Sequence, residues 1–348
     1  MERAKILIVG AGAIGQWLGS LLHERAQADV VLLARTRQLE GLSRGIAYQG
    51  RSLPVEIGDR EASLRAFSEI PDNLQCDDVI FTVKAFQVAE AAAQVQVSRV
   101  RSQRIWGFQN GLGSDEELSA SFPDRWFGAM TTTVPVGFED GQISPGIKGG
   151  LAWATSHPPQ QAPQWLRHMG MPCYAVARVD SLKISKLLLN LTCNASCALL
   201  DKLPGEVVAH HEMFGFELSC LRELLQAAKA LKIPLVDLPN YSVTKMAALN
   251  PLPNFLIRQI LGSKIKKARG QKPPSLLLDL RAGRRQSEVD VLNGAVVALG
   301  KRCGLPTPGN AWLHETLSKV VSQQRPWDDF RGQIDSVARQ AMAALSRK

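Results

Sequence analysis

The stretch Lys5-Ile-Leu-Ile-Val-Gly10-Ala-Gly12-Ala-Ile-Gly15 decides the fold of the first part of this 348-residue chain. A run of aliphatic residues leads directly into Gly-x-Gly-x-x-Gly, and apolar residues with helical spacing follow it. This order predicts a strand, a tight turn and the start of a helix. Gly10 would allow the turn, Gly12 would let a pyrophosphate approach the backbone, and Gly15 would let helix and strand pack closely.

The alternative is a glycine-rich turn in an ordinary strand-helix unit, which the full strand-turn-helix context disfavours. In a dinucleotide-binding unit, the unpaired N–H groups at the start of the helix would face the anion. The predicted cofactor contacts in this loop are therefore Gly10, Gly12, Ala13, Ile14 and Gly15.

Length and composition predict a globular protein of about two domains. The cysteines form no Cys-x-x-Cys pair and have no histidine cluster beside them, so neither a zinc site nor a disulfide framework is expected. A reducing cytosol suits such cysteines best, and no apolar run reaches the roughly 18–20 residues of a membrane span. We therefore expect a cytoplasmic protein without a metal. The cysteines are Cys76, Cys173, Cys193, Cys197, Cys220 and Cys303.

Most of the net charge of +9 lies in one segment, from Arg258 to Arg285, which has nine basic residues and one acid, Asp279. A nucleic-acid surface is one interpretation, but the segment lacks interleaved aromatic residues beyond Phe255 and no known nucleic-acid module surrounds it. The favoured interpretation is a solvated face that steers an anionic substrate or cofactor.

The residues after the second predicted strand, Asp29 to Ala34, indicate the choice of cofactor. An acid at this place would bind the ribose 2′-hydroxyl of NAD, whereas an arginine can pair with the 2′-phosphate of NADP. The chain has Arg35-Thr36-Arg37 here and no acid before Glu40, so NADP is favoured, with Arg35 as its ligand. The alternative is that both arginines are ordinary surface residues.

Further strands are predicted as a hairpin within 45–57, as buried strands at 78–83 and 104–108, and as extra strands within 126–155. The strand at 78–83 is followed by Lys84 and that at 104–108 by Gln109-Asn110-Gly111, where an open α/β sheet binds ligands. From about residue 180 the periodicity is helical, with a cap at Gly304. The predicted domains are a Rossmann-type α/β domain at 1–178 and an all-helical domain at 179–348. The predicted helices are 180–199, 212–231, 241–263, 275–282, 287–303 and 307–322.

Three polar residues, Lys186, Asn190 and Asn194, are spaced four apart in the first of these helices. Within one continuous helix they would share a face, although their neighbours are strongly apolar. Because burying such groups without partners costs roughly several kcal/mol, this polar stripe should face either water or a cleft with partners. Spacing alone does not separate these two alternatives.

Ser275 and Glu288 each have an ordinary structural explanation. Ser275 opens a short helix after two prolines and could be its N-cap, and Glu288 could favour the positive end of the following helix. Taken singly, these structural roles are the preferred interpretation.

From Lys5 to about Thr316 the chain resembles the ketopantoate reductase (2-dehydropantoate 2-reductase) family. The order and spacing of the matching motifs across two domains support the resemblance more than any single motif does. These motifs are Gly10-x-Gly-x-x-Gly15, Thr82-Val-Lys84-Ala-Phe-Gln87, Gln109-Asn-Gly-Leu-Gly113 with Glu116-Glu-Leu118, Gly128-Ala-Met-Thr-Thr-Thr133, Lys186-x-x-x-Asn190-x-x-x-Asn194, Ser275-x-x-x-Asp279-Leu-x-Ala-Gly-Arg284 and Glu288-Val-Asp-x-x-Asn-Gly294.

The resemblance implies NADPH-dependent reduction of 2-dehydropantoate to pantoate, a step of pantothenate biosynthesis, between the two domains. Lys186 would be the general acid and Glu288 would hold a substrate hydroxyl. Asn190, Asn194 and Ser275 would contact the carboxylate and backbone of the substrate. Asn110 would bridge cofactor and substrate, and Lys84 would lie near the cofactor phosphates and ribose.

Two departures from the family pattern concern the substrate. Ala195 stands where the family often has proline, and Leu276 where it often has methionine. One alternative is therefore another 2-oxo or 2-hydroxy acid as substrate. In a different class, the alternative is a non-catalytic nucleotide-sensing or nucleic-acid-binding protein that uses the basic segment 258–285. The expected partner is a small 2-oxo acid, with no nucleic acid or membrane partner. A homodimer is plausible by analogy.

Overall fold

The computed structural model describes residues 3–139, 142–156, 162–262 and 272–346. The chain divides into two compact units. Unit 1 comprises residues 1–109, 113–182 and 238–241, and unit 2 comprises residues 110–112, 183–237 and 242–348.

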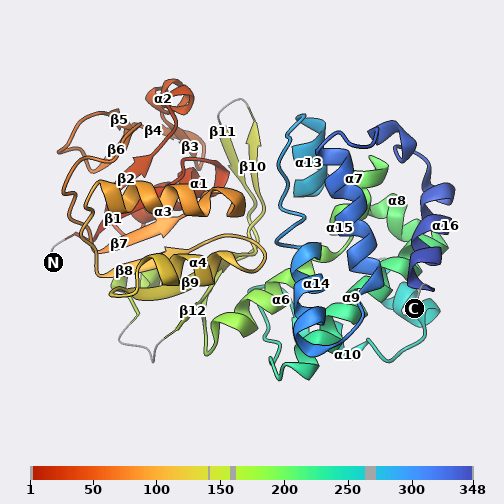
Figure 1. Cartoon of the computed structure of the whole chain (residues 1–348). Coiled ribbons are helices and arrows are strands. Elements are labelled where there is room, and N and C mark those ends of the chain that lie inside the picture. The colour runs from red at the N-terminus through yellow and green to blue at the C-terminus, as the bar shows by residue number, and fades with distance from the viewer. Residues whose placement is uncertain (1–2, 140–141, 157–161, 263–271, 347–348) are drawn as a thin grey trace. The chain divides into compact units, whose positions relative to one another are not determined.

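Unit 1 is an α/β unit built on a nine-stranded sheet in the order β13-β12-β9-β8-β7-β1-β2-β6-β5 (Figure 1). All neighbouring strands of this sheet pair in parallel except β9 and β12, which are antiparallel. Its strands are β1 (Lys5–Val9), β2 (Asp29–Leu33), β5 (Glu56–Ile57), β6 (Leu64–Phe67), β7 (Asp78–Phe81), β8 (Arg104–Gly107), β9 (Trp126–Thr132), β12 (Leu151–Thr155) and β13 (Cys173–Val176).

Two antiparallel hairpins and several helices complete unit 1. The hairpins are β3 (Ile46–Tyr48) with β4 (Arg51–Leu53), and β10 (Val136–Glu139) with β11 (Gln142–Pro145). Helices α3 and α4 lie over the face of the sheet that is turned to the viewer in Figure 1. The helices are α1 (Ala13–Glu24), α2 (Thr36–Ser43), η1 (Ala85–Gln87), α3 (Val88–Val97), α4 (Ser114–Ser121) and α5 (Gln164–Arg167).

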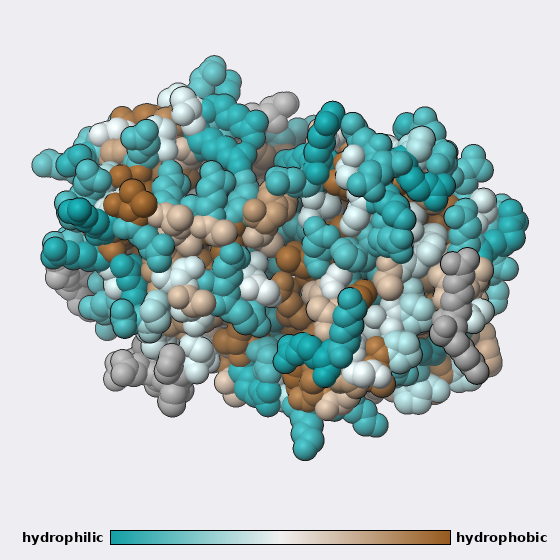
Figure 2. All heavy atoms as spheres, in the orientation of Figure 1, coloured by the Kyte–Doolittle hydropathy of each residue, from teal (hydrophilic) through white to brown (hydrophobic). Residues whose placement is uncertain are grey.

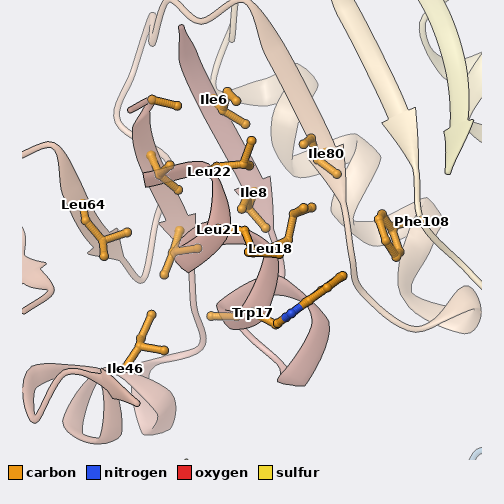
Figure 3. Packing of buried hydrophobic residues seen from close by; sticks show 14 of the residues in the cluster. Ile6, Ile8, Trp17, Leu18, Leu21, Leu22, Ile46, Leu64, Ile80 and Phe108 are labelled. Atoms are coloured by element: carbon orange, nitrogen blue, oxygen red, sulfur yellow. The ribbon is translucent and has the colours of Figure 1, made fainter. Parts of the chain in front are cut away.

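The core of unit 1 forms where α1 packs on the central strands. Trp17, Leu18, Leu21 and Leu22 are buried, as their helical spacing predicted. Figure 3 shows Leu18 and Leu22 beside the side chains that β1 directs toward the helix. This burial of apolar side chains stabilises the unit by roughly 1.5–3 kcal/mol per large side chain. It also fixes the glycine loop, because that loop is the connection between β1 and α1.

A buried carboxylate braces three neighbouring aromatic and basic side chains in unit 1. Asp78, at the start of β7, accepts hydrogen bonds from Arg104 at 2.6 and 2.9 Å, from the indole of Trp106 at 2.7 Å and from that of Trp165 at 2.9 Å. The ring of Trp106 packs edge-on against Trp165 and two further tryptophans. Four donors to one carboxylate make its burial tolerable.

In the part of unit 2 that the structure describes, the regular elements are helical. They are α6 (Val179–Leu191, of which residues 183–191 belong to unit 2), α7 (Asn194–Leu200), α8 (Pro204–Ala209), α9 (His211–Ala230), α10 (Val243–Ala248), α11 (Asn254–Ile257), η2 (Arg258–Gly262, a π-helix), α13 (Ser275–Arg281), α14 (Asn293–Cys303), α15 (Pro308–Val321), η3 (Trp327–Asp329) and α16 (Ile334–Leu345).

The predicted fold class, a Rossmann-type α/β domain followed by an all-helical domain, is confirmed. The predicted strands at 5–9, 29–34, 78–83 and 104–108, the hairpin within 45–57 and the extra strands within 126–155 are all present to within a few residues. The helices expected at 212–231, 275–282 and 307–322 are present, and Gly304 caps α14 in the left-handed region with φ of 67°.

Two predicted helices are wrong as continuous elements. The helix expected at 180–199 is broken into α6 and α7, for a reason described below. The helix expected at 241–263 is broken after Ala248, because Pro251 and Pro253 cannot continue it. Helical structure resumes with α11 and η2. Residue 263, at the end of that prediction, lies outside the described residues.

Hydrophilic residues predominate on the face seen in Figure 2, with hydrophobic residues in scattered patches. Among the described helices, none is long and apolar enough to cross a membrane. Of the predicted basic segment, Lys264, Lys266, Lys267 and Arg269 lie outside the described residues. Arg281 pairs with Asp201 and Arg284 with Asp279, so part of the basic charge in this segment is balanced by ion pairs within unit 2.

Candidate functional site

The glycine loop of unit 1 is tightly built around Gly10 and Gly15. Gly10 has φ of +113°, and a Cβ atom there would come within 2.8 Å of the Val83 side chain at the end of β7. A Cβ atom on Gly15 would overlap the carbonyl oxygen of Gly10. The hydroxyl of Thr82 donates to that same oxygen at 2.6 Å. The end of β1, the start of α1 and the end of β7 therefore meet at a place where only glycine fits.

Gly12 differs from these two glycines because a Cβ atom there would meet no atom within 4 Å. It precedes α1, whose first turn, beginning with Ala13 and Ile14, has no acidic residue and no side-chain cap. The N–H groups of this turn carry the positive end of the helix dipole. An open backbone beside uncapped N–H groups suits a phosphate, so these residues fit a dinucleotide.

Arg35 follows β2 and is exposed, as are Thr36 and Arg37. The turn that holds Arg35 is tied to the glycine loop by Gln38. The Gln38 side chain accepts from the Arg35 N–H at 2.9 Å and donates to the carbonyl of Ala11 at 3.1 Å. An exposed arginine whose backbone is tied to this loop suits the 2′-phosphate of NADP. The sequence reasoning missed Gln38, for which nothing local gives a signal.

Lys84 and Gln109 follow β7 and β8, at the ends of neighbouring strands. Lys84 is half-buried and precedes η1. Gln109 is buried and donates from its amide to the carbonyl of Phe81 at 2.8 Å and to that of Val83 at 3.2 Å. Gln109 thus braces the strand end from which Lys84 projects. Among the described residues, no group of three or more His, Cys, Asp or Glu side chains could hold a metal ion.

In unit 2, Lys186 and Asn190 lie one turn apart on α6. Both are half-buried, whereas their leucine neighbours at 187, 188, 189 and 191 are buried. The predicted face shared by Lys186 and Asn190 is therefore present as a narrow polar strip on an apolar helix. Of the two alternatives weighed for this strip, water and a cleft with partners, half-burial by itself decides neither.

Asn110 is joined to this strip by a hydrogen bond. The Asn190 amide donates to the Asn110 side-chain oxygen at 3.1 Å. The short segment 110–112, which belongs to unit 2, also packs on the turn before α14. The N–H of Leu112 donates to the carbonyl of Val291 at 3.1 Å, and a side chain on Gly111 would overlap that carbonyl. Asn110 and Asn190, which are 80 positions apart in the chain, thus form one polar cluster on α6.

Glu288 lies on this same turn before α14, and its side chain is only 3% exposed. The helix predicted at 287–303 begins at Asn293, so the expectation that Glu288 opens a helix is wrong. Its carbonyl oxygen accepts from the N–H groups of Val291 and Leu292, which closes a tight turn. The turn places Glu288 beside Val291, the residue that holds segment 110–112.

Asn194 is not on the same helix as Lys186, because the chain turns sharply after α6. Cys193 takes the left-handed conformation with φ of 55°, and α7 begins at Asn194. The Cys193 N–H donates at 2.7 Å to the carboxyl group of Glu217 on α9, which also bonds to the hydroxyl of Ser196. Burial raises the pKa of Glu217 to about 7, while the hydrogen bond from Cys193 opposes this shift. The shared face predicted for Asn194 is therefore wrong.

Asn194 instead joins α7 to α13. Its side-chain oxygen accepts from the N–H of Leu276 at 3.1 Å, and its amide lies 3.5 Å from the hydroxyl of Ser275. Ser275 is exposed and is the first helical residue of α13, after the N-cap Pro274. The expectation that Ser275 is the N-cap is wrong, and its hydroxyl is directed toward Asn194.

Two family profiles together cover most of the chain. The profile described as "Ketopantoate reductase PanE/ApbA" matches residues 6–146, and the one described as "Ketopantoate reductase PanE/ApbA C terminal" matches residues 178–321. Among curated proteins, the 2-dehydropantoate 2-reductase of Archaeoglobus fulgidus is 24% identical over 92% of this chain and 99% of its own length. The 2-dehydropantoate 2-reductase of Pyrococcus horikoshii is 24% identical over 89% of this chain and 95% of its own length.

Solved structures share the fold at low sequence identity. A PanE/ApbA family ketopantoate reductase from Ralstonia eutropha superposes with a TM-score of 0.73 at 23% identity, covering 92% of this chain and 99% of that one. A D-mandelate dehydrogenase in ternary complex with NADH and anilino(oxo)acetate gives a TM-score of 0.75 at 21% identity, covering 92% and 98%. With both of its units matched by the family profiles, the chain belongs to the ketopantoate reductase family.

Proposed function

We propose that this protein reduces a 2-oxo acid with NADPH, and that its substrate is 2-dehydropantoate, which becomes pantoate. One observation supports the proposal most strongly: Lys186 lies one turn from Asn190, which is hydrogen-bonded to Asn110, in a family whose curated relatives are named 2-dehydropantoate 2-reductase. A cation beside two amides suits a 2-oxo acid, which offers a ketone oxygen and a carboxylate.

The cofactor in this proposal is held by the glycine loop and its neighbours. Gly10, Gly12 and Gly15 shape the backbone, and the N–H groups of Ala13 and Ile14 bind the pyrophosphate. Arg35 pairs with the 2′-phosphate, Lys84 lies near the phosphates and ribose, and Asn110 contacts the nicotinamide side. NADPH supplies the hydride, and ketopantoate reductases use NADPH.

The choice of NADPH over NADH is tested by replacing Arg35. Its guanidinium is exposed, so the lost phosphate contact should amount to about 1–2 kcal/mol. We expect Arg35→Ala to raise the KM for NADPH by roughly tenfold and to leave the KM for NADH within about twofold. Arg44→Ala, at the exposed end of the same helix, is the matched control. Equal changes for both nucleotides would contradict the assignment of Arg35.

Lys186 acts as the general acid in the proposed reaction. Its ammonium donates a hydrogen bond to the ketone oxygen and gives it a proton as hydride reaches the carbon, so that the carbonyl becomes a secondary alcohol. A cation at the developing alkoxide stabilises charge that exists only in the transition state, an effect of several kcal/mol, roughly. Glu288 accepts a hydrogen bond from a substrate hydroxyl. Asn190, Asn194 and Ser275 bind the carboxylate and backbone of the substrate.

The test is a panel of 2-oxo acids, with the reduction of each measured by the oxidation of NADPH. Purified protein is given 2-dehydropantoate, 2-oxoisovalerate, 2-oxoisocaproate and phenylglyoxylate in turn. The proposal expects the highest kcat/KM for 2-dehydropantoate, because only that compound offers Glu288 a hydroxyl. A higher value for another 2-oxo acid would correct the substrate.

A panel without any turnover would overturn the proposed activity. In that event the nucleic-acid alternative for residues 258–285 predicts binding to duplex DNA that weakens steeply with salt.

A further inference from the structure

The corner between α6 and α7 lies next to two proposed substrate ligands and has no glycine or proline to form it. Cys193, at this corner, takes a left-handed conformation that side-chain-bearing residues adopt only at a cost in free energy. Local sequence does not favour such a corner over a continuous helix. It must therefore be held by contacts with another part of the chain.

Glu217 supplies these contacts from α9, 24 residues further along. One carboxyl oxygen accepts the Cys193 N–H at 2.7 Å, and the other bonds to the Ser196 hydroxyl in the first turn of α7. The N–H of Cys193 thus bonds to a residue of another helix at the place where the chain turns. Both partners of the carboxyl group lie at the start of α7, so the bond pair fixes where that helix begins.

The position of Glu217 is unusual for a charged residue. It is 3% exposed and shares the apolar face of α9 with Met213, Cys220 and Leu224. A carboxyl group in such surroundings is costly unless its oxygens are hydrogen-bonded. A leucine would fill the same space and pack with the same neighbours. The packing of α9 therefore does not require a carboxyl group at this position, whereas the two hydrogen bonds to the start of α7 do.

The residue that directly follows the corner is Asn194, which bonds to α13 through the N–H of Leu276 and the hydroxyl of Ser275. We propose that Glu217 is a positioning residue for substrate binding: by fixing the corner at Cys193, it aligns Asn194 with Ser275. This inference rests on the proposed function, in which Asn194 and Ser275 bind the 2-oxo acid. Glu217 itself touches neither substrate nor cofactor.

The opposite end of α7 provides a matched control. There the indole N–H of Trp327 donates to the carbonyls of Ala198 and Leu199, each at 3.0 Å, and the N–H of Gly332 donates to that of Leu200 at 2.8 Å. Loss of the indole contacts loosens the same helix without touching the corner. A general loosening of α7 and a specific loss of the corner are therefore separable.

The test compares four variants for kinetics with 2-dehydropantoate and for hydrogen exchange of the amides in residues 191–197. Glu217→Leu removes both bonds, whereas Glu217→Gln keeps an acceptor for Cys193 and a donor for the Ser196 hydroxyl. We expect Glu217→Leu to raise the substrate KM by about tenfold, with kcat changed by less than about threefold. The rate of amide hydrogen exchange in residues 191–197 should rise in the same variant. Glu217→Gln should restore both values to within about twofold of wild type.

Trp327→Phe should leave the substrate KM within about twofold of wild type, although it lowers stability. An equal KM rise in Trp327→Phe, or an unchanged KM in Glu217→Leu, overturns the inference. If Glu217→Leu does not fold, Ser196→Ala decides: a KM rise of about threefold supports the inference, and an unchanged KM overturns it. Wild-type protein without turnover would instead refute the proposed function, and hydrogen exchange would still report whether Glu217 holds the corner.

Discussion

Gly12 and Gly15 offer a pair of substitutions that separates cofactor binding from folding. Gly12 has extended backbone geometry, with φ of −80°, and a Cβ atom there meets nothing within 4 Å. Alanine at position 12 should therefore fold as wild type does. A Cβ atom at position 15 overlaps the Gly10 carbonyl oxygen and lies 2.8 Å from the Thr82 hydroxyl. Alanine at position 15 must therefore displace the helix from the strand.

The expected magnitudes follow from this contrast. If a pyrophosphate lies against Gly12, the added methyl group crowds it at a cost of about 1–3 kcal/mol, which raises the Kd for NADPH by roughly 5- to 150-fold. The free energy of unfolding of Gly12→Ala should change by less than about 0.5 kcal/mol. Gly15→Ala should lose about 2 kcal/mol or more of stability, because its clash is with the protein's own backbone.

The assay combines isothermal titration of NADPH with chemical unfolding of both variants. Gly41→Ala, at a position with similar open space and outside the loop, controls for the added methyl group. An NADPH Kd for Gly12→Ala within twofold of wild type would refute the assignment of the pyrophosphate to this loop. A Gly15→Ala protein as stable as wild type would refute the geometric argument for close packing.

Two further predictions concern buried carboxyl groups. Asp78→Asn leaves the donors of Arg104, Trp106 and Trp165 facing an amide, so its free energy of unfolding in urea, followed by tryptophan fluorescence, should fall by about 3–5 kcal/mol. As a control, Asp77→Asn replaces the neighbouring, partly exposed carboxylate and should lower the free energy of unfolding by less than about 1 kcal/mol. Equal losses would contradict the bracing role of Asp78. Burial raises the pKa of Glu217 from 4.5 to about 7. The contribution of its neutral carboxyl group to the free energy of unfolding is therefore fully present below pH 4.5 and is lost as pH rises through 7. Wild type should therefore lose about 3 kcal/mol relative to Glu217→Gln between these limits, and parallel stability curves would show that Glu217 is not buried as described.

The fold was predictable where local patterns decide it. The aliphatic run before Gly10 and the spacing of Trp17, Leu18, Leu21 and Leu22 require only neighbouring residues, and the strand, turn and helix that they predict are present. Strand β13, at one edge of the sheet, and β6, next to the other edge, were missed. They are four residues long, and they become strands by pairing with β2 and β12 rather than through their own composition.

The candidate site was predictable as a set of residues but not as an arrangement. The contact of Asn190 with Asn110 joins residues 80 positions apart, and no local pattern encodes it. The break before Asn194 depends on Glu217, so the helical periodicity of 180–199 gave no sign of it. A signal existed in α9 itself, where a glutamate interrupts the apolar series of Met213, Cys220 and Leu224.

The central claim is that Lys186 protonates the ketone as a 2-oxo acid is reduced. The most direct measurement is the steady-state kinetics of Lys186→Met with 2-dehydropantoate and NADPH. The control is Lys202→Met, which replaces a half-buried, ion-paired lysine of the same unit. General-acid catalysis accounts for about 10²–10⁴-fold in rate, so kcat should fall by at least about 100-fold in Lys186→Met while Lys202→Met stays near wild type. A loss of less than about tenfold in a folded Lys186→Met protein would contradict the claim.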